Sequence, residues 1–315
     1  MRVRFGHEPE GAFADSLSEN LTGTVELVPE GDSAPVDVWV GGRPKAEDLS
    51  TSRPSAVVIP FAGLPVNTRT LLLEHPEIAV YNLHHNAEAT AQMAWALLLA
   101  AARSVVPADR ELRSHDWRRR YAPDPGVLLD GRRLLVIGWG RIGRRVGEFG
   151  RAFGMEVTGV RRVPSQEQGV IGVEELDGHL PHTDVVVVAA PATPATEGLL
   201  GCEQFAAMPK GGLVVNVGRA SICDEDALYD ALFTGHLAGA GLDVWYQYPE
   251  SEEKRVGTAP SRFLFEKLDS VVLSPHRAGH ASDIEPRRGR ELAAVLNALD
   301  RGEGIPRPVD VDAGY

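Results

Sequence analysis

Three glycines, Gly138, Gly140 and Gly143, have the spacing that cradles the phosphates of a dinucleotide. Gly138 ends the apolar run LLVIG, and the helical pattern RIGRRVGEFGRAFG begins directly after Gly140. A strand therefore precedes the motif and a helix follows it. Gly138 allows a tight turn, Gly140 lets the backbone approach the pyrophosphate, and Gly143 lets the helix pack closely on the strand. The helix N-terminus then faces the anion. A plain glycine-rich turn is the alternative, and the context favours a dinucleotide site.

Two arginines, Arg161 and Arg162, follow the next predicted strand, where the adenosine ribose of a bound dinucleotide would lie. In an NAD site an Asp or Glu usually accepts a hydrogen bond from the ribose 2′-hydroxyl there. A carboxylate would repel a 2′-phosphate, whereas a guanidinium binds it through forked, charge-assisted hydrogen bonds. We therefore expect NADP (NADPH) in preference to NAD. The alternative is that both arginines are merely exposed at a strand end.

Arg219 and His276 each follow a strand-like run, in GLVVNVGRA and SVVLSPHRA. Taken alone, the arginine could be a surface residue and the histidine a structural one. Both come after successive strands, however, on the edge of an open α/β sheet where ligands bind. A fixed cation for a carboxylate and a proton donor at an oxygen are what the reduction of a 2-oxo acid needs, together with a hydride donor.

The elements that must position these residues alternate between strands and helices, which indicates parallel sheets wrapped by helices. The predicted strands are 37–40, 56–60, 78–82, 133–138, 155–160, 184–190, 212–218, 239–244 and 270–275. The predicted helices are 67–75, 86–105, 224–235 and the last segment, RGRELAAVLNALDRGE. The fold class is therefore α/β, with two Rossmann-like or flavodoxin-like, doubly wound parallel-sheet domains and a cleft between them.

The domain boundaries follow from a joint and from the last helix. The stretch RRRYAPDPG is polar and rich in Pro and Gly, as joints are. The last helix is amphipathic and is expected to return to the first domain. We predict a substrate (catalytic) domain made of 1–101 plus 284–315 and an NAD(P)-binding domain over 102–283.

Composition excludes several classes of protein. The net charge of −12 over 315 residues argues against a nucleic-acid surface, which needs a basic face. No apolar run is long enough to span a bilayer, and the first residues lack the pattern of a signal peptide. Cys202 and Cys223 are the only cysteines, too few for a disulfide framework. We expect a cytoplasmic protein that binds neither nucleic acid nor membrane.

Several segments, in the right order, resemble the D-isomer-specific 2-hydroxyacid dehydrogenase family. They are DVVVVAAPATPATEGLLG, NVGRASICDEDAL, GAGLDVWYQYP and SPHRAGH. The resemblance covers most of residues 50–302 and is strongest from 128 to 282. It implies an oxidoreductase that transfers a hydride between NAD(P)H and a 2-oxo acid or D-2-hydroxy acid, similar to glyoxylate/hydroxypyruvate reductases. It also implies a homodimer formed through the cofactor domain.

The same resemblance implies a role for each matching position. Arg219 would bind the substrate carboxylate and carbonyl, and His276 would protonate the ketone oxygen as hydride arrives and act as the base in reverse. Asp243 would hold the nicotinamide carboxamide. Backbone N–H groups of the first domain would bind the substrate carboxylate. The residues implied are Arg141 and Ile142 for the pyrophosphate; Ala190, Pro191, Thr196, Val217 and Gly218 for the dinucleotide; and Ala62, Gly63 and Leu64 for the substrate.

The family pattern breaks at Tyr248. The family normally reads D-V-F-x-x-E-P, and its Glu hydrogen-bonds the histidine and raises its pKa; formate dehydrogenases of the same superfamily carry Gln there. Tyrosine can orient an imidazole, but at neutral pH it brings no negative charge.

Three explanations of Tyr248 are open. It orients His276, which then works as a weaker acid; or a nearby carboxylate takes over; or the fold senses a dinucleotide without turnover. We expect the first, because Arg219 and His276 are both present. It predicts reductase activity that falls as pH rises past about 6.5, the ordinary pKa of histidine. The carboxylates considered for the second are Glu250, Glu252 and Glu253.

His84 and His85 form a second departure, in a loop where the family usually has Asn-Thr-Pro. Adjacent histidines usually point to opposite sides, and no partner carboxylate follows at ligand spacing, so we expect no metal site. Either the histidines pack against the long helix, or one of them contacts the far end of the substrate, such as an anionic group.

Two rival functions remain. One is an NADH-linked dehydrogenase of the phosphoglycerate type, against which Arg161 and Arg162 argue. The other is a non-catalytic dinucleotide-sensing protein, similar to the transcriptional corepressors that share this fold, for which only Tyr248 argues.

Overall fold

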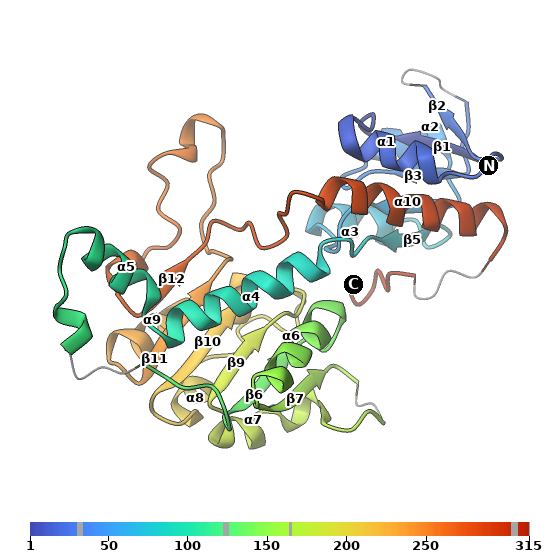
Figure 1. The fold of residues 1–315 in the computed structure, drawn as a ribbon. Helices are drawn as coiled ribbons and strands as arrows, with labels where there is room; N and C mark the ends of the chain where they lie inside the picture. Colours follow the sequence, from blue (N-terminus) through green and yellow to red (C-terminus); the bar gives the residue numbers. More distant parts are fainter. Residues whose placement is uncertain (30–33, 122–125, 164–165, 304–307, 315) are drawn as a thin grey trace. The chain divides into compact units, whose positions relative to one another are not determined.

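The computed structural model describes residues 1–29, 34–121, 126–163, 166–303 and 308–314. The chain forms two compact units, Met1–Asn86 with His280–Tyr315, and Ala87–Gly279 (Figure 1). Each unit has its own parallel sheet, which confirms the predicted α/β class with two parallel-sheet domains.

The smaller unit has five strands in the order β2-β1-β3-β4-β5, the flavodoxin-like order. Its strands are β1 (Arg2–Phe5), β2 (Glu26–Val28), β3 (Val38–Val40), β4 (Ala56–Ile59) and β5 (Ala79–Asn82). Its helices are α1 (Gly11–Asn20), α2 (Ala46–Ser52), α3 (Val66–Leu73) and α10 (Ile284–Asp300). Leu292 and Leu296 of α10 are buried against Val3 and Leu17, so the last helix does return to the first unit.

The larger unit has seven parallel strands in the order β12-β11-β10-β9-β6-β7-β8. The order reverses between β6 and β9, which is the switch point where doubly wound sheets bind ligands. Its strands are β6 (Arg133–Ile137), β7 (Glu156–Arg161), β8 (Val170–Gly172), β9 (Val185–Val188), β10 (Gly212–Asn216), β11 (Leu237–Leu242) and β12 (Val271–Leu273). Its α-helices are α4 (Ala87–Ala102), α5 (Val105–Arg113), α6 (Arg141–Ala152), α7 (Leu176–His179), α8 (Cys202–Ala207) and α9 (Glu225–Phe233). Short 3₁₀ turns cover Arg118–Tyr121, Val173–Glu175, Leu180–His182, Ala220–Ile222, Glu253–Arg255 and Phe265–Lys267.

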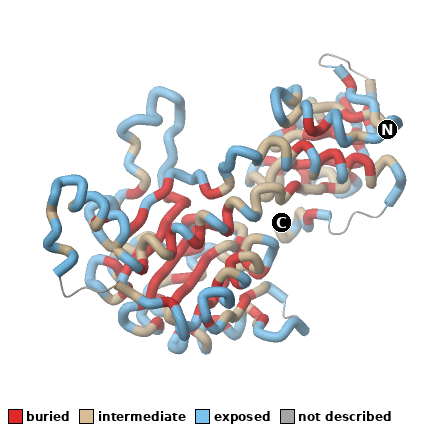
Figure 2. Tube along the Cα trace, in the orientation of Figure 1, coloured by how far each residue is buried: buried red, intermediate tan, exposed pale blue. Residues whose placement is uncertain are grey.

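Successive valines of β9 alternate between two cores. Val185 and Val187 belong to the core that α4 and α6 cover, and Val186 and Val188 to the core that α8 and α9 cover. All four residues are buried. In Figure 2 the central strands of the larger sheet have the colour of buried residues. A strand covered on both faces is apolar throughout, which is why this one reads as an unbroken run.

Helix α4 lies in a different unit from the one predicted. It packs against α6 and against β10, β11 and β12 of the larger unit. The approach is close: a Cβ at Gly241 of β11 would stand 2.6 Å from the Cβ of Leu97. The unit boundaries therefore fall at 86/87 and 279/280 instead of the predicted 101/102 and 283/284. Periodicity indicated a buried helix but not which sheet buries it.

Within the described residues, no single helix is long and apolar enough to cross a membrane. The pair α4 and α5, which is bent by 66°, passes the test of length and composition when the two are taken together. Helix α4 is a core helix here, since its Ala91, Leu97 and Leu98 are buried.

Candidate active site

The turn from β6 into α6 has the backbone shape of a phosphate cradle. Gly138 has a φ of +99°, which favours glycine, and Gly140 caps α6. A Cβ at Gly143 would stand 2.1 Å from the carbonyl oxygen of Gly138, and a Cβ at Gly138 would stand 2.6 Å from the amide nitrogen of Ala190. At Gly138 and Gly143 only glycine leaves room for this turn, whereas the space beside Gly140 is open. Arg141 and Ile142 follow the turn at the helix start. The described residues therefore fit a dinucleotide pyrophosphate.

Trp139, between two of these glycines, was not singled out by the motif. Its indole is buried in the larger unit, where a Cβ at Gly147 or Gly159 would stand 2.4 or 2.3 Å from it. The indole Nε1 donates to Glu167 over 2.8 Å, and Glu167 also accepts from Arg144 over 2.6 Å. This ties the phosphate turn to the loop after β7. The only sign of this role in the sequence is a bulky residue, Trp139, in a region rich in glycine.

The predicted lining residues meet at the carboxyl edge of the sheet. Gly218, after β10, lies so close to Ala190, after β9, that a Cβ on it would stand 2.6 Å from the Ala190 carbonyl oxygen. Thr196 donates to the carbonyl of Pro191 over 2.8 Å, which shapes the loop beyond β9. Val217 is bonded through its amide to Val188 of β9 over 3.0 Å. Arg161 and Arg162 stand at the same edge, at the end of β7.

Arg219 is presented by a turn that the buried Asn216 shapes. The Asn216 side chain accepts from the amide of Gly218 over 3.0 Å and donates to the carbonyl of Arg219, also over 3.0 Å. The Arg219 guanidinium itself is exposed and donates to the Gly218 carbonyl over 2.7 Å. A cation therefore stands at the carboxyl end of β10, as predicted.

The backbone of His276 is left-handed, with a φ of +54°. Residues other than glycine adopt this conformation only at a cost in free energy. Asp243, only 1% exposed, holds this turn from the end of β11. Its carboxylate accepts from the Ser274 hydroxyl and from the amides of Arg277 and Ala278, both over 3.0 Å. The Asp243 carboxylate was predicted to face a carboxamide, and in this structure it fixes the loop that carries His276.

Tyr248 reaches His276 directly. Its hydroxyl oxygen lies 2.9 Å from Nδ1 of His276 and accepts from the amide of Trp245 over 3.1 Å. Burial raises the pKa of Tyr248, with a further rise from Asp243 and opposing contributions from the Trp245 amide and the Arg219 charge. The hydroxyl therefore stays neutral at physiological pH. It orients the ring through Nδ1.

Two of the carboxylates considered as replacements are engaged elsewhere. Glu250 pairs with Lys254 over 2.5 Å, and Glu252 pairs with Arg255 over 2.6 Å. Both pairs lie within the exposed loop after Tyr248. This favours Tyr248 itself as the partner of His276.

The predicted residues of the smaller unit gather at the carboxyl edge of its sheet. Ala62, Gly63 and Leu64 follow β4, and Asn82 at the end of β5 donates to the Ala62 carbonyl over 2.7 Å. That bond fixes the loop whose amides were predicted to meet a carboxylate.

The two histidines after β5 contact α10. The amide of His84 donates to Glu291 over 3.0 Å, and Nε2 of His85 lies 3.4 Å from Nε of Arg288. Burial lowers the pKa of His85 to about 4, with help from Arg288 and His84, so the ring is neutral at physiological pH. Among the described residues, no group of three or more His, Cys, Asp or Glu is placed to hold a metal.

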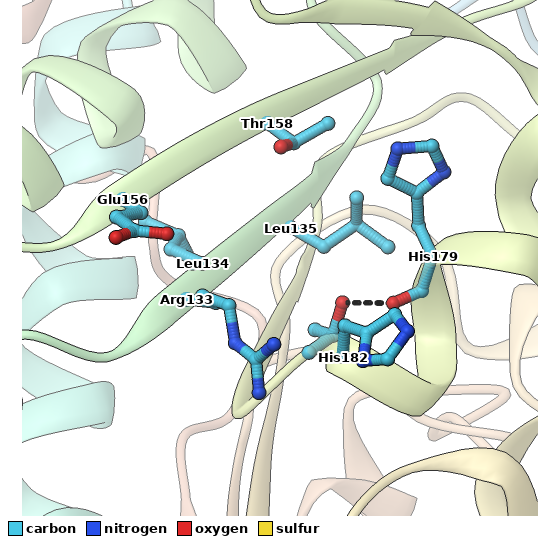
Figure 3. A pocket seen from close by; sticks show the side chains of 8 residues that line it. Arg133, Leu134, Leu135, Glu156, Thr158, His179 and His182 are labelled. Carbon is cyan, nitrogen blue, oxygen red and sulfur yellow. Dashed lines mark hydrogen bonds between the residues drawn. The ribbon is translucent and has the colours of Figure 1, made fainter.

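A shallow pocket of about 100 Å³ lies elsewhere in the larger unit (Figure 3). Arg133 and Glu156, which begin β6 and β7, line it together with His179 and His182. It is therefore at the amino edge of the sheet, opposite to the carboxyl edge where the cradle, Arg219 and His276 lie.

The chain matches the family described as D-isomer specific 2-hydroxyacid dehydrogenase, NAD binding domain, over residues 95–278. The chain belongs to this family. The match covers the larger unit almost entirely, from within α4 to the turn after His276, so the glycine cradle, Arg219 and His276 all lie inside it.

Several members of the 2-hydroxyacid dehydrogenase family are similar to this chain. A glyoxylate reductase from Korarchaeum cryptofilum is 37% identical over 71% of the chain and 66% of the relative. A D-3-phosphoglycerate dehydrogenase from Mycobacterium leprae is 35% identical over 73% of the chain, but over only 42% of the relative. The chain thus matches less than two thirds of the length of either relative.

Solved structures of the family superpose over nearly the whole chain. A D-isomer specific 2-hydroxyacid dehydrogenase from Xanthobacter autotrophicus, in complex with NADPH and MES, has a TM-score of 0.79 and 25% identity and covers 100% of this chain and 99% of its own. An NADPH-dependent glyoxylate/hydroxypyruvate reductase from Sinorhizobium meliloti, in complex with citrate, has a TM-score of 0.76 and 26% identity, and 98% of each chain is covered.

Proposed function

We propose that this protein is an NADPH-linked reductase of a small 2-oxo acid, of the glyoxylate or hydroxypyruvate kind. The observation that carries the proposal is the contact of 2.9 Å between Tyr248 and Nδ1 of His276, at the same sheet edge as Arg219 and the glycine cradle. A sensor of dinucleotides would need the cradle but not an oriented imidazole at the same sheet edge as a cation. The similarity to glyoxylate reductases supports the same substrate class.

The residues at the carboxyl edge have complementary roles in this proposal. A bound nicotinamide dinucleotide, when reduced, supplies a hydride for the carbonyl carbon of the substrate. Arg219 pairs with the substrate carboxylate. Protonated His276 gives the proton on Nε2 to the carbonyl oxygen, and Tyr248 keeps Nδ1 in place meanwhile. In the reverse reaction, neutral Nε2 accepts the hydroxyl proton.

NADPH oxidation against a panel of 2-oxo acids, with NADH in parallel, tests the proposal. We expect turnover with NADPH on a small member of the panel, and a preference for NADPH that depends on Arg161 and Arg162. Replacing both with Ala should raise KM for NADPH about 10- to 100-fold, because charge-assisted hydrogen bonds are lost, and leave KM for NADH nearly unchanged. Arg132→Ala, at the opposite edge of the sheet, is the matched control. Tight NADPH binding without turnover on any substrate would instead favour the sensor.

Tyr248→Glu should move the reductase activity to higher pH. A carboxylate at Nδ1 stabilises the imidazolium, so the pKa of His276 rises and the proton donor persists to higher pH. We expect the pH of half-maximal kcat to rise by about 1 unit or more. Tyr248→Phe, which removes the hydroxyl and adds no charge, should lower kcat without that rise. An unchanged midpoint in Tyr248→Glu would show that residue 248 does not act on His276.

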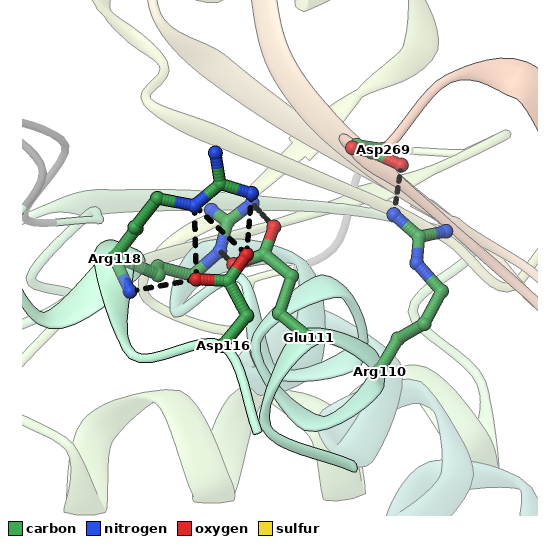
Figure 4. A network of polar contacts seen from close by, with 6 residues as sticks. Arg110, Glu111, Asp116, Arg118 and Asp269 are labelled. Carbon is green, nitrogen blue, oxygen red and sulfur yellow. Dashed lines mark hydrogen bonds and ion pairs between the residues drawn. The ribbon is translucent and has the colours of Figure 1, made fainter. Parts of the chain in front are cut away.

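We also propose a homodimer formed through the larger unit. Exposed apolar side chains follow α4, among them Trp117 (62% exposed) and Tyr121 (79% exposed). Three arginines of this region pair with carboxylates: Arg118 with Asp116 over 2.6 Å, Arg119 with Glu111 over 2.8 Å, and Arg110 with Asp269 over 2.7 Å (Figure 4). An apolar surface with paired charges suits a second copy of the chain. A monomeric mass by light scattering at micromolar concentration would contradict this.

A further inference from the structure

The segment after β11 carries two tyrosines whose hydroxyl groups bind on two different loops. Tyr248 contacts His276, as described above. Tyr246 donates its hydroxyl to the backbone carbonyl of Cys223 over 2.8 Å. Trp245, next to Tyr246, donates its indole N–H to the carbonyl of Ser274 over 2.8 Å, just before the His276 turn. One short segment is thus bonded both to the His276 loop and to the loop that runs from Arg219 to Cys223.

The loop between Arg219 and Cys223 is bonded to the protein at both of its ends. At its start, Asn216 binds the amide of Gly218 and the carbonyl of Arg219. At its end, Cys223 is 1% exposed, its amide donates to Ala220 over 2.9 Å, and its thiol accepts from Asn216 over 3.6 Å. Among the described residues, the Tyr246 hydroxyl is the recorded partner of the Cys223 carbonyl. Removing that hydroxyl therefore loses one bond at the end of the loop, where a backbone bridge to Leu200 remains. Asn216 carries the change to the start of the loop, because its side chain contacts both the Cys223 thiol and the carbonyl of Arg219.

We propose that Tyr246 is a positioning residue for Arg219, and that it sets the place of the guanidinium relative to His276. The inference rests on the proposed function, because it assigns Arg219 to the carboxylate of the 2-oxo acid. The bond from Tyr246 to Cys223 and the bond from Tyr248 to His276 start two residues apart on one segment. A shift of that segment therefore moves the cation and the proton donor together, and their separation is kept.

The surroundings of Tyr246 suit a permanent donor. Its ring is half-buried and packs on the core that contains Cys223 and Trp245. Burial raises the pKa of the hydroxyl, with smaller contributions from Cys223, Glu225 and Asp224, so it stays protonated over the whole working range. The residue thus holds the loop by hydrogen bonding and not by charge.

Tyr246→Phe tests the inference, because it removes one hydroxyl and keeps the ring. Arg219 binds the substrate carboxylate in both the ground state and the transition state, so its displacement should raise KM with little change in kcat. We expect KM for the 2-oxo acid to rise about five- to twentyfold, and the Kd of NADPH to change less than about twofold. Tyr229→Phe is the matched control. Tyr229 is also half-buried on this core, stacks 4.6 Å from Phe263, and has no hydrogen bond recorded for its hydroxyl within the described chain.

A double-mutant cycle separates positioning from general destabilisation. If Tyr246 acts through Arg219, Tyr246→Phe should add little to the KM of Arg219→Lys, because the guanidinium it positions is already gone. Fully additive effects, or a fall in kcat with KM unchanged, would overturn the inference. Should the wild-type protein turn over no 2-oxo acid, the proposed function fails. Binding of oxalate to the NADPH complex, measured by calorimetry, then tests the inference alone: equal affinity in wild type and Tyr246→Phe would overturn it, as would no binding to either.

Discussion

His276→Asn should lower kcat for the 2-oxo acid by about 10²- to 10⁴-fold, the contribution of a positioned general acid. Asparagine is the informative replacement because it tolerates the left-handed backbone that His276 adopts, with a φ of +54°. The loop can therefore keep its shape while the proton donor is lost. The Kd of NADPH should stay within about threefold, since the cradle at Gly138 lies on a different strand.

A second histidine provides the control for backbone effects. His115 also has a positive φ, +59°, and is exposed in the segment after α5. His115→Asn makes the same chemical change at the same kind of backbone, so kcat should be unchanged. If His276→Asn keeps kcat within about tenfold of wild type, another group supplies the proton. If both variants lose activity equally, the loss reflects the backbone and not the acid.

The sequence predicted most of the fold because parallel strands buried on both faces leave a strong pattern. The valines of 185–188 read as a strand, and so do the other strands of the larger sheet except β8, whose three residues were not predicted. The strands of the smaller unit were harder to predict from the sequence. Strand β1, over Arg2–Phe5, alternates Arg with apolar residues, and β2 has only three residues, so neither was predicted. Short strands of mixed polarity gain their stability from the sheet and not from their own pattern.

The residues of the candidate site likewise fall into those that the sequence predicted and those that it did not. The cradle glycines, Arg219 and His276 were predicted because the carboxyl ends of neighbouring parallel strands meet at one edge. Tyr248 was also predicted, as the residue that orients His276, but two other residues that hold the site were not. Trp139 and Tyr246 act through single hydrogen bonds to a side chain or a carbonyl distant in sequence, at 2.8 Å in each case. Periodicity and residue spacing do not indicate such a bond, because it depends on how closely two loops approach each other once the sheet has formed.

Asp243→Ala should be the most damaging single change outside the proton donor. It leaves the Ser274 hydroxyl and the amides of Arg277 and Ala278 without the carboxylate that they now share. Each donor left unsatisfied in a buried position costs about 1–3 kcal/mol, so we expect the free energy of unfolding to fall by about 3 kcal/mol or more. The left-handed turn at His276 loses its support, and kcat should fall by at least about 10²-fold.

Asp243→Asn distinguishes the two roles open to this residue. Its amide group keeps the size and one acceptor oxygen but cannot accept at the other position, so the bond to Ala278 or to Arg277 is lost. If Asp243 mainly fixes the His276 loop, hydrogen exchange at these two amides should accelerate and kcat should fall, with the Kd of NADPH nearly unchanged. If it mainly holds the carboxamide of the cofactor, the Kd should rise and the exchange rates should stay as they are.

Asp224→Asn supplies the matched comparison for this change from carboxylate to amide. Asp224 caps α9 by accepting from the amide of Ala227 over 2.9 Å, and asparagine caps helices about as well as aspartate. The variant should keep both stability and kcat. The contrast follows from the number of donors each carboxylate serves: one oxygen suffices at the helix cap, whereas three donors converge on Asp243. An equal loss in the two variants would mean that the charge, and not the count of acceptors, matters at Asp243.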